Sequence, residues 1–401
     1  MNILFTYTGF LPADAWGGPV KIIYQNALEL KRRGHHVHIA TSNLLSKHQR
    51  LHKGNVSGEV NGLDVDYLQL YNIPKWPGTL GPTRLGPLAR QRLKQLIVQA
   101  DVIHVNAVRN ALTLEGVHLA YAEGKPILLQ PHGTLPHIVS SIRLKQMFDS
   151  VFLGSLLSKI DAFLALQQAE LQQIVAAGGD PELVHIVPNG LATQSTLKPE
   201  VIIDFKRRLQ IPDNRQVILF LGRINRKKGT DILIRSFDAI PEERRKSLHL
   251  VIVGPDDGQL GEVNALIEQY QLREQVTLPG LLSGNEIQAS YGIADLFILP
   301  CRTDTFPVTI IEACRAGVPM VVTETCEIAD LIENRAATIT PVDPKAIADA
   351  MVRTLDDSDL RAMYAAGAQE LMDTVFSIEA VGDALEKIYT QVLEESRSRV
   401  H

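Results

Sequence analysis

Short apolar runs alternate with longer segments of helical periodicity along the whole chain, and the alternation occurs twice. In the first half, the runs that predict strands are residues 3–7, 36–40, 101–105, 126–130, 162–166 and 184–187. In the second half, they are residues 217–222, 248–254, 276–280, 296–300, 318–322 and 337–340. The first helical segment shows the pattern, because Val20, Ile23, Ala27 and Leu30 recur at helical spacing before Gly34.

Strand–helix alternation of this kind predicts an α/β protein with parallel sheets covered on both faces. The chain has 401 residues, which is long for a single core. A polar segment with Pro and Gly at 187–199 separates the two series. We therefore expect two doubly wound domains, 1–190 and 191–376. A last helix at about 377–397 has no strand after it and is a candidate to pack back on the first domain.

The composition is that of an ordinary globular protein, with 45% hydrophobic and 21% charged residues and a formal net charge of −5. It gives no reason to expect nucleic acid as a partner. Residues 1–195 hold 17 Lys and Arg against 13 Asp and Glu, whereas the remainder holds 23 against 32. Any attraction to an anionic surface therefore belongs to the first half.

The cysteines and the first residues of the chain indicate the cellular compartment to expect. Cys301, Cys314 and Cys326 form no CxxC pair and predict no disulfide framework, which is typical of a reducing cytoplasm. The start MNILFTYTGF lacks the features of a signal peptide, and no uninterrupted apolar span of 18 residues occurs. We expect a cytoplasmic protein.

Ligands of open parallel sheets bind beyond the carboxyl ends of the strands, so the residues that follow each strand are candidates for a site. Gly17 and Gly18 come after the first strand and before a helix, where backbone amides can approach an anion; a plain turn is the alternative. No GxGxxG pattern with a following acid occurs, which argues against NAD. His132 follows a later strand, next to a Gly, although a lone histidine is more often structural than catalytic.

A basic group follows the strand at 217–222. Arg223 comes directly after it, and we expect Lys227 and Lys228 to open the next helix with Gly229, ahead of Asp231 in its first turn. Basic residues at a helix start oppose the helix dipole and therefore need another reason to be there. A bound diphosphate is one reason, because Arg offers a planar fork and Lys a compact charge. A solvated basic turn is the alternative.

Two pairs of aspartates resemble metal-binding patterns only superficially. Asp256 and Asp257 lie in a Pro-Gly loop of ordinary turn composition. Asp64 and Asp66 match a DxD pattern, but we expect them to precede a strand rather than follow one. We therefore expect no metal site.

The segment TDTFPVTIIEACRAG at 303–317 predicts a short helix at about 307–316 with an acid inside an apolar run. Pro307 suits its first turn and Gly317 its end. Glu312 would project from a largely buried helix, with Asp304 in the loop before it. Two interpretations remain open: an ion pair of Glu312 with Arg315 or Lys228 on a surface, or a ligand that offers hydroxyls to Glu312 and an anion to the helix N-terminus.

Together these motifs resemble the family-four retaining glycosyltransferases of the GT-B fold, glycosyl transferases group 1. The resemblance rests on GRINRKKG at 222–229 and FPVTIIEACRAGVPMVV at 306–322, with RRGHHVHIA at 32–40 and VPNG at 187–190. It implies two Rossmann-like domains with the active site in the inter-domain cleft. It also implies a nucleotide-sugar substrate, with no cofactor and no metal.

The resemblance implies roles for individual residues. Arg223 and Lys228 would hold the diphosphate, Glu312 would accept hydrogen bonds from the ribose hydroxyls, and Asp304 would contact the sugar. The implied catalytic residues are His132, Arg223, Lys228 and Asp304. The implied donor-binding residues are Gly17, Gly18, Arg223, Lys228, Asp304, Phe306, Pro307, Val308, Thr309 and Glu312.

The chain departs from the family pattern around the sugar. Asp304 stands where the family usually has Glu, Pro307 where it usually has Gly, and Glu327 near a frequent Gly pair. The resemblance implies transfer of a hexose-type sugar from a UDP- or GDP-sugar to a glycan or lipid-linked acceptor, as in polysaccharide biosynthesis. A sugar-nucleotide epimerase of the same fold and a non-catalytic binding partner remain alternatives.

The acceptor is not encoded in a recognisable motif. The segment at 84–99 is basic and partly amphipathic, which would suit peripheral contact with the inner face of an anionic membrane. A solvated helix packed on the sheet is the alternative.

Overall fold

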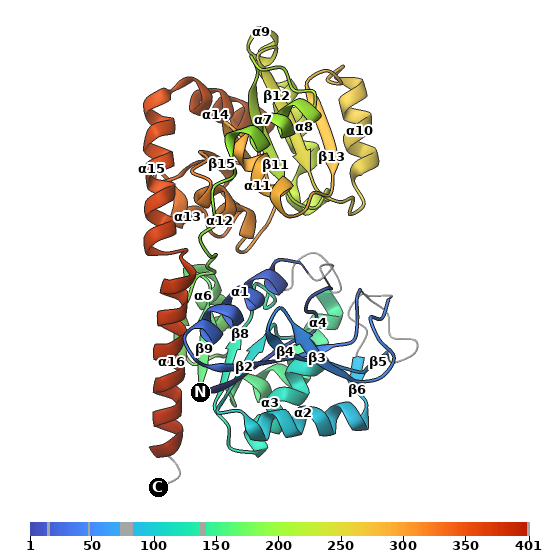
Figure 1. Cartoon of the computed structure of the whole chain (residues 1–401), viewed down its shortest axis with the longest axis vertical. Coiled ribbons are helices and arrows are strands. Elements are labelled where there is room, and N and C mark those ends of the chain that lie inside the picture. The colour runs from blue at the N-terminus through green and yellow to red at the C-terminus, as the bar shows by residue number, and fades with distance from the viewer. Residues whose placement is uncertain (14–16, 47–48, 73–82, 137–141, 399–401) are drawn as a thin grey trace. The chain divides into compact units, whose positions relative to one another are not determined.

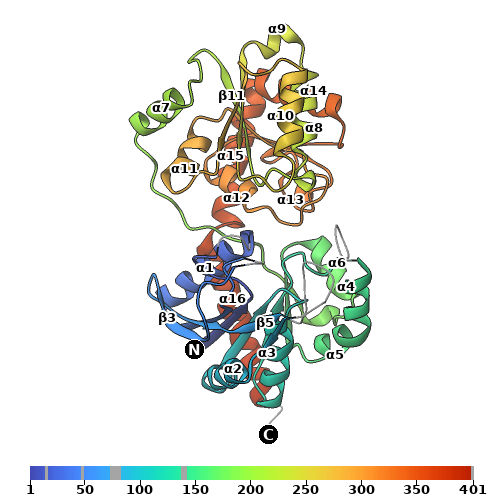
Figure 2. The same ribbon diagram turned by 90° about the vertical axis from the view of Figure 1, so that its right-hand side faces the viewer.

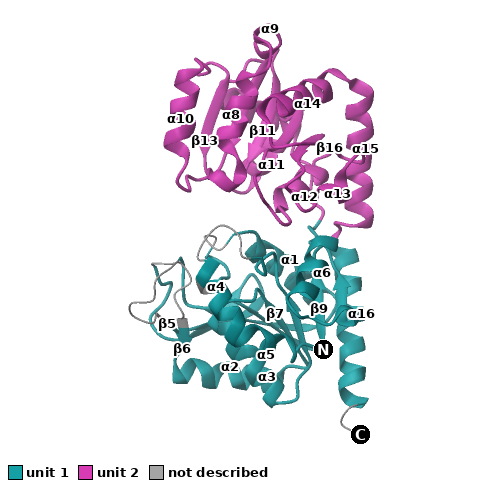
Figure 3. Cartoon of the chain, turned by 180° about the vertical axis from the view of Figure 1, so that it is seen from behind, with its two compact units in different colours: residues 1–192, 378–401 teal, residues 193–377 magenta. Residues whose placement is uncertain are grey.

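The computed structural model forms two compact units, Met1–Ala192 with Ile378–His401 (unit 1) and Thr193–Ser377 (unit 2) (Figure 1, Figure 3). It describes residues 1–13, 17–46, 49–72, 83–136 and 142–398. Each unit is built around one large and mainly parallel sheet. The α/β class predicted from the alternating pattern is confirmed, and each predicted strand has a counterpart.

The large sheet of unit 1 has the strand order β10-β9-β8-β7-β1-β2-β4-β3. Its strands are β1 (Asn2–Tyr7), β2 (His36–Ser42), β3 (Val56–Val60), β4 (Leu63–Leu68), β7 (Val102–Asn106), β8 (Ile127–Gln130), β9 (Ala162–Ala165) and β10 (Val184–Ile186). All neighbours are parallel except β3 and β4. From β1 the chain builds outward to β2 on one side and later to β7 on the other, so the strand order reverses between β1 and β7. A small ribbon pairs β5 (Leu70–Asn72) with β6 (Thr83–Leu85).

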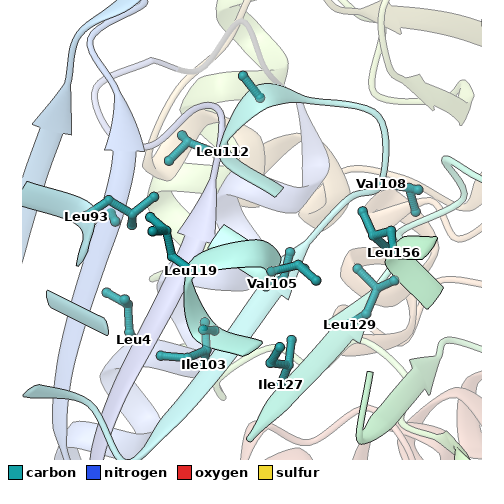
Figure 4. Packing of buried hydrophobic residues seen from close by; sticks show 14 of the residues in the cluster. Leu4, Leu93, Ile103, Val105, Val108, Leu112, Leu119, Ile127, Leu129 and Leu156 are labelled. Atoms are coloured by element: carbon teal, nitrogen blue, oxygen red, sulfur yellow. The ribbon is translucent and has the colours of Figure 1, made fainter. Parts of the chain in front are cut away.

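Helices cover both faces of this sheet. They are α1 (Gly18–Arg32), α2 (Pro87–Gln99), α3 (Ala111–Ala122), α4 (Ile142–Phe148), a π-helical turn (Asp149–Leu153), α5 (Gly154–Leu157), α6 (Gln168–Ala176), a 3-10 turn (Pro181–Leu183) and α16 (Ile378–Ser398). One core lies under α2 and α3 and contains Leu93 and Leu112 of these helices together with Ile103 of β7 and Leu129 of β8 (Figure 4). The other core contains residues of α1 and α16, which lie side by side (Figure 1, Figure 2).

The terminal helix α16 belongs to unit 1. Leu385 and Tyr389 are buried in the same cluster as Ile3 and Phe5 of β1. Arg33, just after α1, donates to Asp383 at 2.6 Å and to Glu386 at 2.7 Å. Apolar packing and ion pairs therefore both hold this helix against the first unit, although the chain passes through unit 2 before reaching it.

The hairpin β3–β4 was not predicted, and its existence corrects the interpretation of the DxD pattern. Asp64 and Asp66 lie inside β4 rather than before a strand. Asp66 is buried, accepts hydrogen bonds from Arg92 Nε at 2.9 Å and Ser57 Oγ at 2.5 Å, and pairs with His38 Nε2 at 2.7 Å. Its polar neighbours explain why the acid stands within the sheet.

Helix α2 contains most of the basic segment considered for membrane contact. Its apolar side, with Leu93 and Ile97, is buried in the core of unit 1. Arg90 and Lys94 pair with Glu115 and Glu123, each at 2.8 Å. The geometry therefore accounts for α2 as a helix packed on its own unit. Over the part of the chain that the structure describes, no helix is both long and apolar enough to cross a membrane.

Unit 2 contains a wholly parallel sheet of order β13-β12-β11-β14-β15-β16. Its strands are β11 (Gln216–Leu221), β12 (Leu248–Val253), β13 (Val276–Gly280), β14 (Leu296–Leu299), β15 (Met320–Thr323) and β16 (Ala337–Thr340). The chain runs from β11 outward to β13 and then returns to β14 on the other side of β11. The strand order therefore reverses between β11 and β14, the kind of position where open α/β sheets bind ligands.

The helices of unit 2 complete the doubly wound arrangement. They are α7 (Pro199–Arg208), a 3-10 turn η4 (Arg226–Lys228), α8 (Thr230–Asp238), α9 (Glu242–Arg245), α10 (Leu260–Gln269), α11 (Asn285–Gly292), α12 (Val308–Arg315), α13 (Ala329–Ile332), α14 (Pro344–Asp356) and α15 (Ser358–Thr374). Helix α8 lies between α10 and α14. The three cysteines are buried and unpaired, and all belong to this unit.

Candidate functional site

An ion pair lies at the reversal point of unit 2. Lys228 comes from the loop after β11 and Asp304 from the loop after β14, and the ammonium donates to the Asp304 carboxylate. The two side chains are 18% and 20% exposed, so solvent or a ligand can still reach them. Neighbouring parallel strands thus bring together two predicted site residues that are far apart in the sequence.

The backbone around Lys228 differs from the prediction. Lys227 and Lys228 lie in η4, before α8, and not in the helix itself. Gly229 separates the two elements at φ 70°, and a Cβ there would lie 1.9 Å from the Pro300 carbonyl oxygen. Only glycine fits this approach of the η4 turn to the end of β14. Because Lys228 precedes the first turn of α8, the predicted conflict with the α8 dipole is reduced.

Side chains behind η4 fix its position. Asn225 Oδ1 accepts from the Lys228 backbone N–H at 3.0 Å. Arg302, in the loop after β14, donates to the Arg226 carbonyl oxygen at 2.8 Å and to both carboxylate oxygens of Asp231 at 2.8 and 2.6 Å. The loops after β11 and β14 are therefore joined independently of the Lys228–Asp304 pair.

Arg223 is placed directly after β11 and is more exposed than Lys228. Its side chain is 57% exposed, and its Nη1 lies 3.3 Å from Asp257 Oδ2. The neighbouring acid, Asp256, accepts from the backbone N–H groups of Gly258, Gln259 and Leu260 at 2.9 to 3.1 Å. The Asp256–Asp257 pair thus has protein partners at the start of α10 and beside Arg223.

Helix α12 begins where the sequence predicted it. Pro307 is its N-cap residue, Val308 and Thr309 form its first turn, and the buried Phe306 packs edge-on against Phe376. The first N–H groups of a helix lack intrahelical partners and carry its positive dipole end. The hydroxyl oxygen of Thr309 is also buried without a hydrogen-bond partner among the described residues.

Glu312 is 5% exposed and has protein partners. The Tyr291 hydroxyl of α11 lies 3.0 Å from Glu312 Oε2 and 3.2 Å from the Thr309 carbonyl oxygen, and it donates to them. Burial, followed by the charge of Glu312, raises the pKa of Tyr291 well above its usual range. Burial lowers the pKa of Arg315, while the charge of Glu312 opposes that change.

The expected surface ion pair of Glu312 is wrong in one respect, because the Glu312 side chain is buried. Tyr291 and Arg315 make it a buried acid with polar and electrostatic partners, which by itself explains its presence in an apolar helix. A ligand hydroxyl as a further partner of Glu312 stays a prediction. Lys228, the other expected partner, binds Asp304 instead.

Unit 1 positions the remaining predicted residues at the carboxyl ends of its own strands. Gly17, at φ 82°, is the N-cap of α1, and among the described residues nothing lies within 4 Å of a Cβ built on it. Gly18 begins that helix. His132 follows β8 at φ 53°, and its Nε2 lies 2.8 Å from Asn106 Oδ1 at the end of β7. A left-handed backbone at a non-glycine residue is strained and often marks a functional position.

The sequence did not predict four residues that contact the candidate site residues or their loops: Asn106, Glu170, Tyr291 and Arg302. Asn106 and Arg302 come at or after strand ends, so the rule used for the other candidates could have found them. Glu170 is buried in α6 and accepts from the Gly133 N–H at 2.6 Å. Glu170 and Tyr291 act from helices that follow other strands, and only tertiary structure shows what they touch.

Two family models match successive parts of the chain. The Glycosyl transferase 4-like domain matches residues 17–190, and Glycosyl transferases group 1 matches residues 201–371. Together they cover most of the sequence. The short gap between them, 191–200, separates the strands of the two large sheets along the chain. They match the same two segments that contain the predicted site residues.

Curated relatives align over part of their length. A D-inositol 3-phosphate glycosyltransferase of Xylanimonas cellulosilytica is 28% identical over 251 residues, which are 60% of this chain and 59% of that protein. An alpha-D-kanosaminyltransferase of Streptomyces kanamyceticus is 30% identical over 182 residues, 45% of this chain and 47% of that protein. The alignments thus span about half to three-fifths of these relatives.

Solved structures share the fold over nearly the whole chain. Anabaena Alr3699/HepE, in complex with UDP and glucose, has a TM-score of 0.76 and 18% identity, covering 98% of this chain and 100% of that one. WaaG, a glycosyltransferase involved in lipopolysaccharide biosynthesis, has a TM-score of 0.69 and 18% identity, covering 96% and 99%. With two doubly wound units and both family models matched in order, the chain belongs to the family-four, group 1 glycosyltransferases of the GT-B fold.

Proposed function

We propose that the protein is a retaining glycosyltransferase that moves a hexose-type sugar from a UDP- or GDP-sugar to a glycan or lipid-linked acceptor. The observation that carries the proposal is the meeting of Lys228 and Asp304 at the strand reversal of unit 2. A cation for a diphosphate and an acid for sugar hydroxyls lie together there, in a family that transfers sugars. Family membership supports the reaction class.

The proposed chemistry follows from charge. Cleavage of the bond between the anomeric carbon and the phosphate oxygen leaves negative charge on the departing diphosphate. In the proposal, Lys228 and Arg223 stabilise that charge together with the N-terminus of α12. These groups take the part that a metal ion plays in other phosphate chemistry, so we propose that transfer needs neither a metal nor a cofactor.

Lys228 is suited to this task by its contact with Asp304. The carboxylate holds the ammonium near the reversal point before a donor arrives. An ammonium has three N–H donors, so it can bind Asp304 and a phosphate oxygen at once. In the proposal, Asp304 also accepts from a hydroxyl of the sugar, and the leaving phosphate takes the acceptor's proton during attack on the same face.

The other site residues have narrower proposed roles. Glu312 accepts from the ribose hydroxyls while Tyr291 fixes one of its oxygens. Phe306, Pro307, Val308 and Thr309 shape the start of α12, where the backbone faces the phosphates. For His132 we propose a contact with the sugar. The glycines Gly17 and Gly18 allow close backbone approach to the phosphates.

Names of similar proteins suggest where to begin with substrates. HepE has been crystallised with UDP, with UDP-glucose, and with UDP and glucose, which makes UDP-sugars the first donors to test. One relative is named for D-inositol 3-phosphate and another is an alpha-galactosylglucosyldiacylglycerol synthase. Polar phosphate-bearing and glycolipid acceptors are therefore the first acceptor classes to test.

The decisive experiment incubates the purified protein with UDP- and GDP-sugars, with and without acceptors, in the presence of EDTA. We expect acceptor-dependent transfer with retention at the anomeric carbon, detected by NMR. Conversion of a donor sugar without acceptor would identify an epimerase instead. Donor binding with neither transfer nor hydrolysis would identify a binding partner. Activity lost in EDTA and restored by magnesium would show that a metal takes part.

A further inference from the structure

His132 and Asn106 meet across two neighbouring strands of unit 1. Asn106 is the last residue of β7 and pairs in register with Gln130 of β8, two residues before His132. The left-handed backbone at His132 and Gly133 turns the chain there, and His132 Nε2 lies 2.8 Å from Asn106 Oδ1. At this distance the two side chains form a hydrogen bond, so one of them must be the hydrogen-bond donor and the other the acceptor.

The orientation of the Asn106 amide decides which atom donates. Asn106 is fully buried, and its Nδ2 donates to the Thr6 carbonyl oxygen at 3.4 Å and the His104 carbonyl oxygen at 3.3 Å. A flipped amide would turn its oxygen toward both carbonyl oxygens and its NH₂ toward the ring. The two carbonyls therefore favour the orientation in which Oδ1 faces His132. Because Oδ1 can only accept, His132 must carry a proton on Nε2.

The surroundings favour a neutral ring. Burial lowers the pKa of His132 to about 3. The nearby ring of His104 has its pKa lowered to about 3 by burial and then by His132. Two charged side chains bind the backbone that follows His132. Glu170 accepts from the N–H of Gly133, and Arg109 donates to the carbonyl oxygens of Thr134 and Leu135. These charged groups bind the backbone, whereas the His132 ring itself forms its hydrogen bond with the uncharged Asn106.

A neutral ring with a proton on Nε2 has its lone pair on Nδ1. That atom has no hydrogen-bond partner among the residues that the structure describes, and it is not among the fully buried polar atoms without partners. We propose that Asn106 is a positioning residue that holds His132 in the Nε2–H form, so that Nδ1 accepts a hydrogen bond from a hydroxyl of the sugar substrate. The identity of that hydroxyl rests on the proposed function, whereas the tautomer does not.

In this tautomer His132 cannot act as a general acid through Nδ1. A ring that stays neutral near pH 7 and presents a lone pair orients a hydroxyl, and it has no proton on Nδ1 to give to a leaving group. Asn106 is needed because imidazole in solution can carry its proton on either nitrogen. A carboxylate at position 106 would act differently, since it stabilises imidazolium.

The first test is NMR of the full-length chain with ¹⁵N-labelled histidine, in which the His132 signals are identified by their loss in His132→Gln. We expect the Nε2–H pattern from pH 5.5 to 8, with no titration. In Asn106→Asp we expect the pKa of His132 to rise so that the ring titrates within this range. A wild-type ring that carries its proton on Nδ1, or that titrates near pH 6.5, would overturn the proposal. The wild-type spectrum decides even if Asn106→Asp does not fold.

The second test compares two amides at position 132 in transfer assays. The side chain of Asn can place its carbonyl oxygen near the position of Nδ1, whereas Gln reaches the position of Nε2. We expect His132→Gln to lose about tenfold in kcat/KM and His132→Asn to retain most of it, as for loss of one hydrogen bond. The reverse order would contradict the role of Nδ1. Absence of transfer in the wild type would reject the proposed function and leave the NMR result standing.

Discussion

The ammonium of Lys228 binds the carboxylate of Asp304 across the point where the sheet of unit 2 reverses its strand order. The two residues are 76 positions apart in the sequence and reach each other because β11 and β14 are adjacent. The contact makes each residue dependent on the other. A diphosphate that binds Lys228 must share the ammonium with Asp304, and a sugar that binds Asp304 does so beside a cation.

Replacing Lys228 by Ala should weaken nucleotide-sugar binding by ~2–3 kcal/mol, because a charge-assisted contact to phosphate is lost at a partly buried position. Lys227→Ala is the matched control, since the adjacent Lys227 is exposed and belongs to the same turn. Isothermal titration of both variants measures the difference. Equal affinities would remove Lys228 from the donor site.

Arg223→Ala should have a smaller effect than Lys228→Ala. The Arg223 side chain is 57% exposed, so water screens its charge and replaces part of its contact. We expect a loss of ~1 kcal/mol in donor affinity that shrinks further at 0.5 M salt. A loss larger than that of Lys228→Ala would mean that Arg223 moves into a closed contact when the donor binds.

Tyr291→Phe should reduce donor affinity by ~1 kcal/mol, since it removes the hydrogen bond that orients Glu312 and keeps the buried ring. Glu312→Gln should reduce donor affinity more, because the carboxylate proposed to accept from the ribose hydroxyls becomes an amide. Both variants are compared by titration with donor and by thermal melting without it. A large fall in Tm of Glu312→Gln with unchanged affinity would instead make Glu312 a structural partner of Tyr291 and Arg315.

Asp304→Glu should change the ranking of sugars while leaving the affinity for free UDP or GDP nearly constant. The extra methylene moves the carboxylate relative to the sugar, and a site with a misplaced hydrogen-bond partner discriminates against substrates that leave a polar group unpaired. Competition by free UDP and GDP provides the control, because neither carries a sugar. An equal loss for free nucleotide and nucleotide-sugar would assign Asp304 to the phosphate site through Lys228.

Much of the fold could be predicted from sequence because apolar strands that are buried on both faces give an unmistakable pattern. The hairpin β3–β4 was missed because β3 reads VSGEV and is largely exposed, and because Asp64 and Asp66 interrupt the apolar pattern of β4. Residues that follow strands, such as Arg223 and Asp304, could be proposed as site candidates from topology alone. The Lys228–Asp304 contact could not, because it depends on which strands become neighbours.

The residues that support the site could not be predicted from the sequence, for a different reason. The bond from Tyr291 to Glu312 joins α11 to α12, and Glu170 reaches the turn at His132 from α6. Nothing in the local sequence around a buried Tyr or Glu says which distant backbone or side chain it will meet. Such contacts follow from tertiary packing rather than from periodicity.

The Asp231–Arg302 pair should make stability depend on pH in the acid range. Burial would raise the pKa of Asp231, but hydrogen bonds from Arg302 and then Gln259 outweigh it and lower the pKa to about 2. The unfolded value is near 3.9. A lowered folded pKa stabilises the protein above the unfolded value, and this stabilisation is lost as pH falls from about 4 to about 2.

Asp231→Asn should therefore destabilise unit 2 by ~1–2 kcal/mol at pH 6 and by progressively less toward pH 3. Urea unfolding of both proteins at pH 6, 4 and 3 measures the gap. Asp330→Asn, at an exposed acid of the same unit, is the control for general charge removal. A gap that stays constant over this range would show that the ion pair does not set the pKa of Asp231.

The most direct measurement is a thermal-shift titration in EDTA with UDP, GDP and their sugars, applied to wild type, Lys227→Ala and Lys228→Ala. A ligand that binds only the folded state raises its stability by about 2.7 kcal/mol at a concentration of 100 times Kd. If unit 2 binds a nucleotide-sugar through Lys228 without a metal, at least one of these ligands raises the Tm of the wild type and of Lys227→Ala but leaves Lys228→Ala nearly unchanged. Equal Tm shifts in all three proteins, or no shift in the wild type, would contradict metal-free binding of a nucleotide-sugar through Lys228.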